Sequence, residues 1–203
     1  IFFQKGRPPR CRNLLNYYEM SFRLRMSGAN FERGLYIVSE ISIRNEKESD
    51  SQRISEVITL AFENDPISDK REAEIVRLMR EDSALSLSLV AETKDKIVGH
   101  IAFSKVTIDG EYIDWYGLAP ISIDPEFQSR GIGTQLVNEG IKRLTEMNAK
   151  GCVLLGEPDY YGRFGFRANA QLIFPGVPAE YFQALALGDS IPSGTVKYHH
   201  AFG

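Results

Sequence analysis

Residues 119–137, Ala-Pro-Ile-Ser-Ile-Asp-Pro-Glu-Phe-Gln-Ser-Arg-Gly-Ile-Gly-Thr-Gln-Leu-Val, join an apolar strand to a glycine-containing turn and then to a helix. Pro125 ends the strand because proline has no amide hydrogen to continue a β-ladder. Gly131 and Gly133 carry no Cβ, so a ligand can approach the main chain closely. We expect the rest of the fold to be organised around this stretch.

The segment after Gly131 has the period of an amphipathic helix. Its apolar positions at helical spacing are Ile132, Leu136, Val137, Ile141 and Leu144. The glycine turn is therefore a helix N-terminus, where free main-chain amides and the positive end of the helix dipole favour a phosphate group. The alternative is an ordinary turn in which the two glycines serve only packing.

Composition excludes several classes of protein. The 203 residues are 43% hydrophobic and 25% charged, which is typical of one soluble domain with an appendage. No apolar run approaches the length of a membrane span. The two cysteines, Cys11 and Cys152, have no partner at metal-ligand spacing. We expect no metal, no membrane attachment and a cytoplasmic location.

Charge is unevenly distributed along the chain. Residues 1–36 hold seven Lys or Arg against two Glu, although the whole chain has a formal charge of −3. We expect residues 1–36 to form a basic, loosely ordered N-terminal extension, with a targeting peptide as the alternative, and residues 37–203 to form the folded domain. The acidic body disfavours a nucleic-acid partner and favours a cationic, amine-bearing one.

Periodicity predicts the order strand, two helices, three strands, helix and strand. The expected strands lie within 36–43, 87–93, 96–108, 112–123 and 152–155, and the first two helices within 51–62 and 72–79. Two late strands, 172–174 and 195–198, are expected on either side of a short helix at 179–185. Gly99 and Pro120 are expected to mark bulges in their strands.

Two motifs resemble those of the GCN5-related N-acetyltransferase (GNAT) family. Gln128-x-x-Gly131-x-Gly133 after a strand resembles the family's acyl-CoA pyrophosphate loop, and it is neither a Walker loop nor a three-glycine dinucleotide motif. Residues 160–166, Tyr-Tyr-Gly-Arg-Phe-Gly-Phe, are similar to the family's aromatic motif. The element order over 37–170 also agrees, and residues 182–202 resemble a subgroup of predicted bacterial acetyltransferases.

The resemblance implies an α/β fold of the α+β kind, with a mixed, mostly antiparallel central sheet flanked by helices. A V-shaped opening between the parallel strands that carry Ile123 and Leu155 would hold acetyl-CoA as co-substrate, without a metal. A bulge beside Ile121 would free amides to polarise the thioester carbonyl. The resemblance assigns cofactor contacts to Ile121, Ser122, Ile123, Gln128, Ser129, Arg130, Gly131, Ile132, Gly133 and Thr134.

The resemblance also implies a general acid. The family's tyrosine lies five residues before the last Phe of the aromatic motif, which gives Tyr161 here, with Tyr160 as the alternative. No general base is assigned; the candidates are Asp114, Asp124, Glu157 and Asp159. The three histidines have no triad partner in the sequence, and we expect His100, His199 and His200 to lie on the surface.

The expected function is transfer of an acetyl group from acetyl-CoA to a primary amine of a small-molecule or peptide acceptor. The first alternative is a non-catalytic acyl-CoA-binding module of the same fold, and the second is an unrelated phosphate-binding α/β protein. The sequence names no acceptor and does not decide between a monomer and a homodimer.

Overall fold

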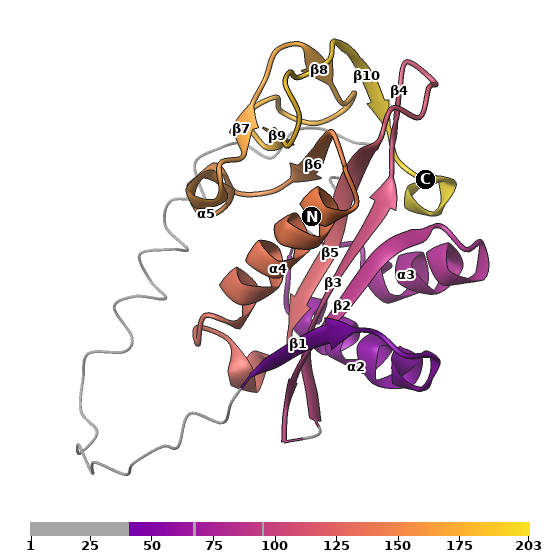
Figure 1. Cartoon of the computed structure of the whole chain (residues 1–203). Coiled ribbons are helices and arrows are strands. Elements are labelled where there is room, and N and C mark those ends of the chain that lie inside the picture. Colours follow the sequence, from indigo (N-terminus) through magenta and orange to yellow (C-terminus); the bar gives the residue numbers. More distant parts are fainter. Residues whose placement is uncertain (1–40, 67, 95) are drawn as a thin grey trace. The chain divides into compact units, whose positions relative to one another are not determined.

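The computed structural model describes residues 41–66, 68–94 and 96–203 (Figure 1). These residues form a mixed seven-stranded sheet of order β1-β2-β3-β5-β6-β9-β7, and a smaller sheet of order β4-β10-β8. The N-terminal extension expected over 1–36 and most of the strand expected over 36–43 lie outside the described residues. No helix in the described ranges is both long enough and apolar enough to cross a membrane.

Most element positions agree with the periodicity of the sequence. In chain order the elements are β1 Ser42–Asn45, α2 Ser51–Phe62, α3 Glu72–Glu81, β2 Leu85–Thr93, β3 Lys96–Lys105, β4 Thr107–Ile108, β5 Trp115–Ile123, α4 Ile132–Glu146, β6 Gly151–Leu155, α5 Pro158–Tyr161, β7 Arg167–Ala168, β8 Leu172–Ile173, β9 Phe182–Ala186 and β10 Gly194–Lys197.

Helices cover both faces of the large sheet, α4 on one face and α2 with α3 on the other (Figure 1). Each face has its own apolar core, because successive side chains of a strand point to opposite faces of the sheet and each helix packs one apolar stripe on the face that it covers. On the α4 face, Leu136 and Val137 pack with Ile101 and Phe103. On the other face, the apolar stripes of α2 and α3 pack on β2 and β3 through Ile54, Val57, Ile58, Ile75, Val76, Met79, Val90 and Ile97.

The sheet opens between β5 and β6. These two strands run parallel and pair from Trp115 opposite Gly151 to Gly117 opposite Val153. Within the described chain their pairing stops there, although β5 continues to Ile123. The other neighbouring strands of this sheet pair antiparallel. The mixed, mostly antiparallel sheet with a V-shaped opening is therefore confirmed.

Both expected bulges are present. Between the pairs Ile101–Ile121 and Phe103–Leu118, β5 has two residues where β3 has one, so Pro120 lies in a bulge. The ladder of β2 and β3 also shifts register directly beside Gly99. Proline has no amide hydrogen to donate to a ladder. Because Pro120 lies in the bulge, it is not paired with a β3 residue, and the β3–β5 ladder continues on both sides of it.

The prediction of a short helix over 179–185 is wrong, because these residues lead into strand β9. The segment is rich in Ala, Leu and Gln, which have high intrinsic helix propensity. In the fold it pairs with β6 on one edge and with β7 on the other. The buried Gln183 side chain also donates to the Gly156 carbonyl at 2.9 Å. These long-range hydrogen bonds override the local preference.

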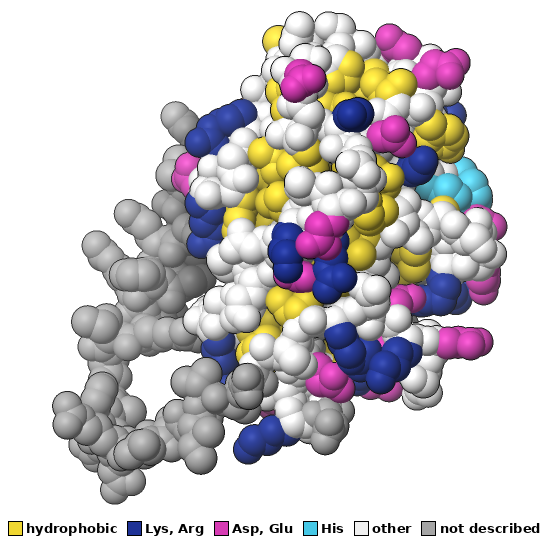
Figure 2. All heavy atoms as spheres, viewed as in Figure 1, with side chains coloured by type: hydrophobic (Ala, Val, Ile, Leu, Met, Phe, Trp, Pro, Cys, Tyr) yellow, Lys and Arg dark blue, Asp and Glu magenta, His cyan; other side chains and the backbone are white. Residues whose placement is uncertain are grey.

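Charged side chains of both signs are interspersed on the face shown in Figure 2, with apolar side chains between them. Exposed ion pairs, such as those of Arg77 with Glu74 and Glu81, contribute little to stability. The pair of Arg53 and Asp124 is more buried, and through it Arg53 joins α2 to the end of β5. Its Nη2 lies 2.7 Å from Asp124 Oδ2, and its Nε donates to the Ile97 carbonyl at 3.1 Å. Asp124 is only 4% exposed.

Arg53→Ala should therefore lower the free energy of unfolding by about 2 kcal/mol or more, since it leaves the buried Asp124 carboxylate with the Glu126 amide at 3.2 Å and, as its nearest cation, Lys96 at 3.6 Å. Urea denaturation measures this loss. Arg77→Ala is the matched control because Arg77 pairs with carboxylates at an exposed site, and it should cost under about 1 kcal/mol. Equal losses in the two variants would contradict the structural role of Arg53.

Candidate functional site

The loop between β5 and α4 has an unusual backbone conformation, which two side chains hold in place. Ser129 and Gly131 have positive φ angles of 60° and 79°, and Gly131 is the N-cap of α4. Two side chains brace the loop: Gln128 Nε2 donates to the Ile123 carbonyl at 3.2 Å, and Arg130 Nη2 donates to the Glu126 carbonyl at 2.8 Å. Where left-handed and right-handed residues alternate, main-chain amides can converge in a concavity that suits an anion.

The first turn of α4 has free donors. Gln135 is the first helical residue whose amide bonds back to the loop, donating to the Gly131 carbonyl at 3.1 Å. Among the described residues, no main-chain carbonyl accepts from the amides of Ile132, Gly133 or Thr134. These donors, together with the helix dipole, suit a phosphate group. The predicted helix N-terminus is therefore present at Ile132.

Gly131 and Gly133 are glycines for different structural reasons. Gly131 needs its left-handed backbone, and a Cβ there would meet no atom within 4 Å. At Gly133 a Cβ would lie 2.9 Å from the Tyr160 hydroxyl, so this ring packs over the start of α4. Packing thus explains Gly133 in part, while the open side of Gly131 leaves space for a ligand.

Of the three residues assigned on β5, Ile121 and Ile123 share the α4 face, and Ser122 points to the opposite face. Ile121 lines a pocket beside the strand. Ser122 lies opposite His100 in the ladder, and its side chain is buried. Ile123 packs toward Gly99 on the α4 face. Only the main chain of Ser122 can therefore contribute to a site in the opening. Beyond Gly117, the β6-facing edge of β5 has no strand partner in the described structure, so its main-chain groups are available.

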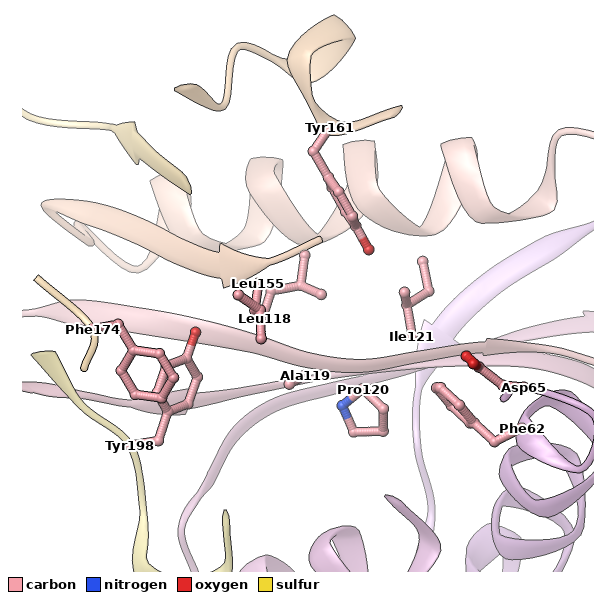
Figure 3. A pocket seen from close by; sticks show the side chains of 10 residues that line it. All are labelled: Phe62, Asp65, Leu118, Ala119, Pro120, Ile121, Leu155, Tyr161, Phe174 and Tyr198. Atoms are coloured by element: carbon pink, nitrogen blue, oxygen red, sulfur yellow. The ribbon is translucent and has the colours of Figure 1, made fainter. Parts of the chain in front are cut away.

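A pocket of about 140 Å³ lies where β5 and β6 separate (Figure 3). Residues from both faces of the sheet contribute to it: α5 lies above the strands in this view, and the C-terminal end of α2 lies below them. The lining residues are Phe62, Asp65, Leu118, Ala119, Pro120, Ile121, Leu155, Tyr161, Phe174 and Tyr198. The bulge at Pro120 is thus part of the pocket wall.

Tyr161 directs its hydroxyl into the space between Leu155 and Ile121 (Figure 3). The residue is 9% exposed, and its ring packs edge-on against Tyr160 and Phe166. Burial, followed by the nearby Tyr160, raises the pKa of the Tyr161 phenol well above its ordinary value. The phenol is therefore protonated at neutral pH and can donate a proton in the pocket. The hydroxyl of Tyr160 faces Gly133 instead.

None of the four candidate bases lines the pocket in the described structure. Asp114 precedes β5 at its far end and lies 3.5 Å from Lys105. Asp124 is held by Arg53. Glu157 is the half-buried residue before α5, where burial and then Asp159 raise the pKa of its carboxyl.

The carboxylate that does line the pocket is Asp65, just beyond the end of α2. Sequence analysis missed it. Asp65 is about 55 residues from β5 in the chain and belongs to no motif, so only the tertiary fold brings it to the pocket.

The expectation that His100 is on the surface is wrong, since its side chain is 0% exposed. Its Nε2 lies 2.9 Å from Ser88 Oγ, which in turn donates to Glu46 Oε2 at 2.5 Å. His100 occupies β3, which is covered on both faces, so a polar residue there is enclosed. His200 is exposed as expected, with its Nε2 2.9 Å from Asp82, and His199 is largely covered beside it.

Burial of His100 predicts a pH dependence of stability. Desolvation lowers its pKa from 6.5 to about 4, with Glu46 opposing the shift and Arg80 adding to it. Between these values the unfolded chain binds more protons, so lowering the pH from 6.5 to 4 should destabilise the fold by up to about 3 kcal/mol. Urea midpoints across this range measure the loss. His100→Gln should show a shallower slope, and an unchanged slope would contradict the assignment.

The chain is similar to proteins of one family. It matches the model of the acetyltransferase (GNAT) domain over residues 42–168. The Escherichia coli protein described as uncharacterized N-acetyltransferase YhbS is 36% identical over 168 residues, which cover 79% of this chain and 97% of that protein.

Two solved structures are also similar. A GNAT family acetyltransferase from Brucella melitensis, in complex with acetyl-CoA, is 44% identical with a TM-score of 0.74, over 81% of this chain and 99% of that one. YhbS from Escherichia coli, in complex with CoA, is 34% identical with a TM-score of 0.75, over 86% and 96% of the two chains.

Proposed function

This chain belongs to the GNAT acetyltransferase family, and we propose that it transfers the acetyl group of acetyl-CoA to the nitrogen of a primary amine. The observation that carries the proposal is the opening of the sheet after Gly117 and Val153, into which the protonated hydroxyl of Tyr161 points. The opening gives two reactants a common space, and the phenol provides a proton donor there.

We assign the cofactor to the α4 side of this opening. The amides that follow Ser129, through Thr134, would hold the pyrophosphate, because they have free donors at a helix N-terminus. The unpaired edge of β5 from Ile121 to Ile123 would hold the pantetheine through main-chain hydrogen bonds, as an added strand would. The complexes of the two similar proteins with acetyl-CoA and CoA support an acyl-CoA as the ligand of this chain.

When bound, acetyl-CoA supplies an acetyl group on a thioester, whose C–S bond breaks as the C–N bond to the amine forms. In this scheme a main-chain amide beside the bulge at Pro120 donates to the thioester oxygen and stabilises the charge that develops there. Tyr161 gives its phenolic proton to the departing sulfur. The amine releases a proton to solvent at the open mouth of the pocket, and Tyr161 recovers one from solvent, so the protons balance.

Thiol release tests the proposal. Purified protein incubated with acetyl-CoA and pooled primary amines should release free CoA thiol well above the rate measured without amine. A binding-only module of the same fold would take up acetyl-CoA and leave thiol release at the background rate. That result would reject the transfer reaction.

A further inference from the structure

We infer that the pocket on the α2 side of the opening is the acceptor site and that it takes a primary ammonium group on a compact apolar body, as in an arylalkylamine. The inference rests on the proposed function, because it concerns the second reactant of that transfer. It goes further by giving the acceptor's charge, its size and the residue that recognises it, Asp65.

The pocket crosses the sheet at the point where acetyl transfer is proposed. Tyr161 reaches it from α5, while Phe62 and Asp65 reach it from the end of α2 on the opposite face (Figure 3). Pro120 and Ile121 lie between these two groups. An acceptor that enters from the α2 side therefore reaches the edge of β5 from one face of the sheet, while acetyl-CoA reaches it from the α4 face. The acceptor and the cofactor can thus bind without blocking each other.

The charge of the residues that line the pocket favours an acceptor that carries a positive charge. Of the ten residues that line the pocket, Asp65 is the one with a carboxyl side chain. The other hydroxyl, on Tyr198, is directed to the Val153 carbonyl at 3.3 Å, and burial raises its pKa. No lysine or arginine is among the ten. An ammonium group gains a charge-assisted hydrogen bond here, whereas a carboxylate on the acceptor would be left without a partner.

The volume of the pocket and its apolar lining favour a compact apolar group on the acceptor. At about 140 Å³ the pocket is close to the roughly 150 Å³ apolar cavity known to accept benzene. Phe174 and Tyr198 form an aromatic wall, with their ring centroids 5.4 Å apart in an edge-on arrangement. Asp65 and Phe62 lie at the end nearer Ile121 (Figure 3). An ammonium at that end places its apolar body along Pro120 toward the aromatic wall.

Asp65 binds and orients the ammonium through its carboxylate, and the ammonium gives one proton to solvent before its nitrogen attacks the thioester. The main chain around it is fixed separately, because its amide donates to the Phe62 carbonyl at 3.0 Å and its carbonyl accepts from Lys70 Nζ at 2.5 Å. Replacing the carboxylate by an amide keeps both of these main-chain hydrogen bonds. Asp65→Asn is a suitable test variant, and Asp65→Glu is the variant that restores the charge.

Calorimetric titration of the CoA-loaded protein tests the inference directly. The three probes are 2-phenylethylamine, phenylalanine, which adds a carboxylate to the same body, and 2-phenylethanol, which lacks the charge. We expect 2-phenylethylamine to bind at least about tenfold more tightly than either other probe. Asp65→Asn should weaken its binding by about tenfold or more, and Asp65→Glu should restore most of the affinity.

Glu63→Gln is the matched control, since it removes one negative charge from the same end of α2 at an exposed position outside the pocket. It should bind 2-phenylethylamine as the parent protein does. No binding of 2-phenylethylamine, equal binding of phenylalanine, or equal losses in Asp65→Asn and Glu63→Gln would each overturn the inference.

Thiol release from acetyl-CoA separates this inference from the proposed function. Charge-dependent binding without transfer to any amine would reject the transfer and leave the pocket assignment standing. Transfer that favours phenylalanine or a polyamine over 2-phenylethylamine would reject the acceptor class and leave the transfer standing. Transfer to 2-phenylethylamine that depends on Asp65 through KM, with kcat little changed, supports both.

Discussion

Tyr161→Phe should lower kcat by at least about a hundredfold while leaving acetyl-CoA affinity little changed. The hydroxyl points into the pocket beside Ile121, and burial keeps it protonated at neutral pH (Figure 3). Removing it takes away the proposed proton donor but keeps the aromatic packing against Tyr160 and Phe166. Single-turnover kinetics measure the chemical step, and calorimetry measures cofactor binding.

Tyr160→Phe is the matched control, because it removes a hydroxyl from the adjacent ring, where that hydroxyl faces Gly133 rather than the pocket. Its kcat should stay near that of the parent protein. If Tyr160→Phe loses activity and Tyr161→Phe does not, the acid is Tyr160. If neither variant loses activity, water or another side chain protonates the thiolate, and the assignment to Tyr161 is wrong.

Gly133→Glu should weaken acetyl-CoA binding by about a hundredfold or more. The new carboxylate lies at the free amides of α4, where it would occupy the pyrophosphate's space and repel its charge; two like charges at about 4 Å repel by about 4 kcal/mol at an intermediate effective dielectric. A side chain at this position must also displace the Tyr160 hydroxyl, 2.9 Å from the Cβ. Calorimetric titration of the folded variant measures the affinity.

Asn138→Glu places the same charge on an exposed part of α4 beyond its first turn. It should bind acetyl-CoA with nearly the affinity of the parent protein, since the effect of a helix terminus falls off within one turn. Unchanged affinity in folded Gly133→Glu would remove the loop from the cofactor site.

The features that the sequence predicted correctly depend on residues that are close together in the chain. The helix that starts at Ile132 and the bulge at Pro120 depend on residues within a few positions of one another. These features were predictable because backbone restrictions of Gly and Pro and the helical period act over short distances. The choice of Tyr161 came instead from the resemblance to the family's aromatic motif, and in the structure its hydroxyl points toward the opening.

The features that were missed depend on distant partners. β9 has the composition of a helix and becomes a strand because β6 and β7 pair with it on both edges. His100 is buried in β3, beside Ser88 of the neighbouring strand β2, and no residue near it in the sequence signals this. Asp65 reaches the pocket only because α2 packs across β5. Local propensity is a weak guide wherever tertiary pairing decides the outcome.

The most direct test of acetyl transfer follows the acetyl group itself. Purified protein, acetyl-CoA labelled in the acetyl carbons and excess 2-phenylethylamine are mixed and quenched, and the products are identified by mass spectrometry. We predict labelled N-acetyl-2-phenylethylamine and free CoA in equal amounts, formed far faster than without protein. If the label stays on CoA with this amine and with every amine of the pooled set, the protein binds the cofactor without transferring its acetyl group, and the proposed function is wrong.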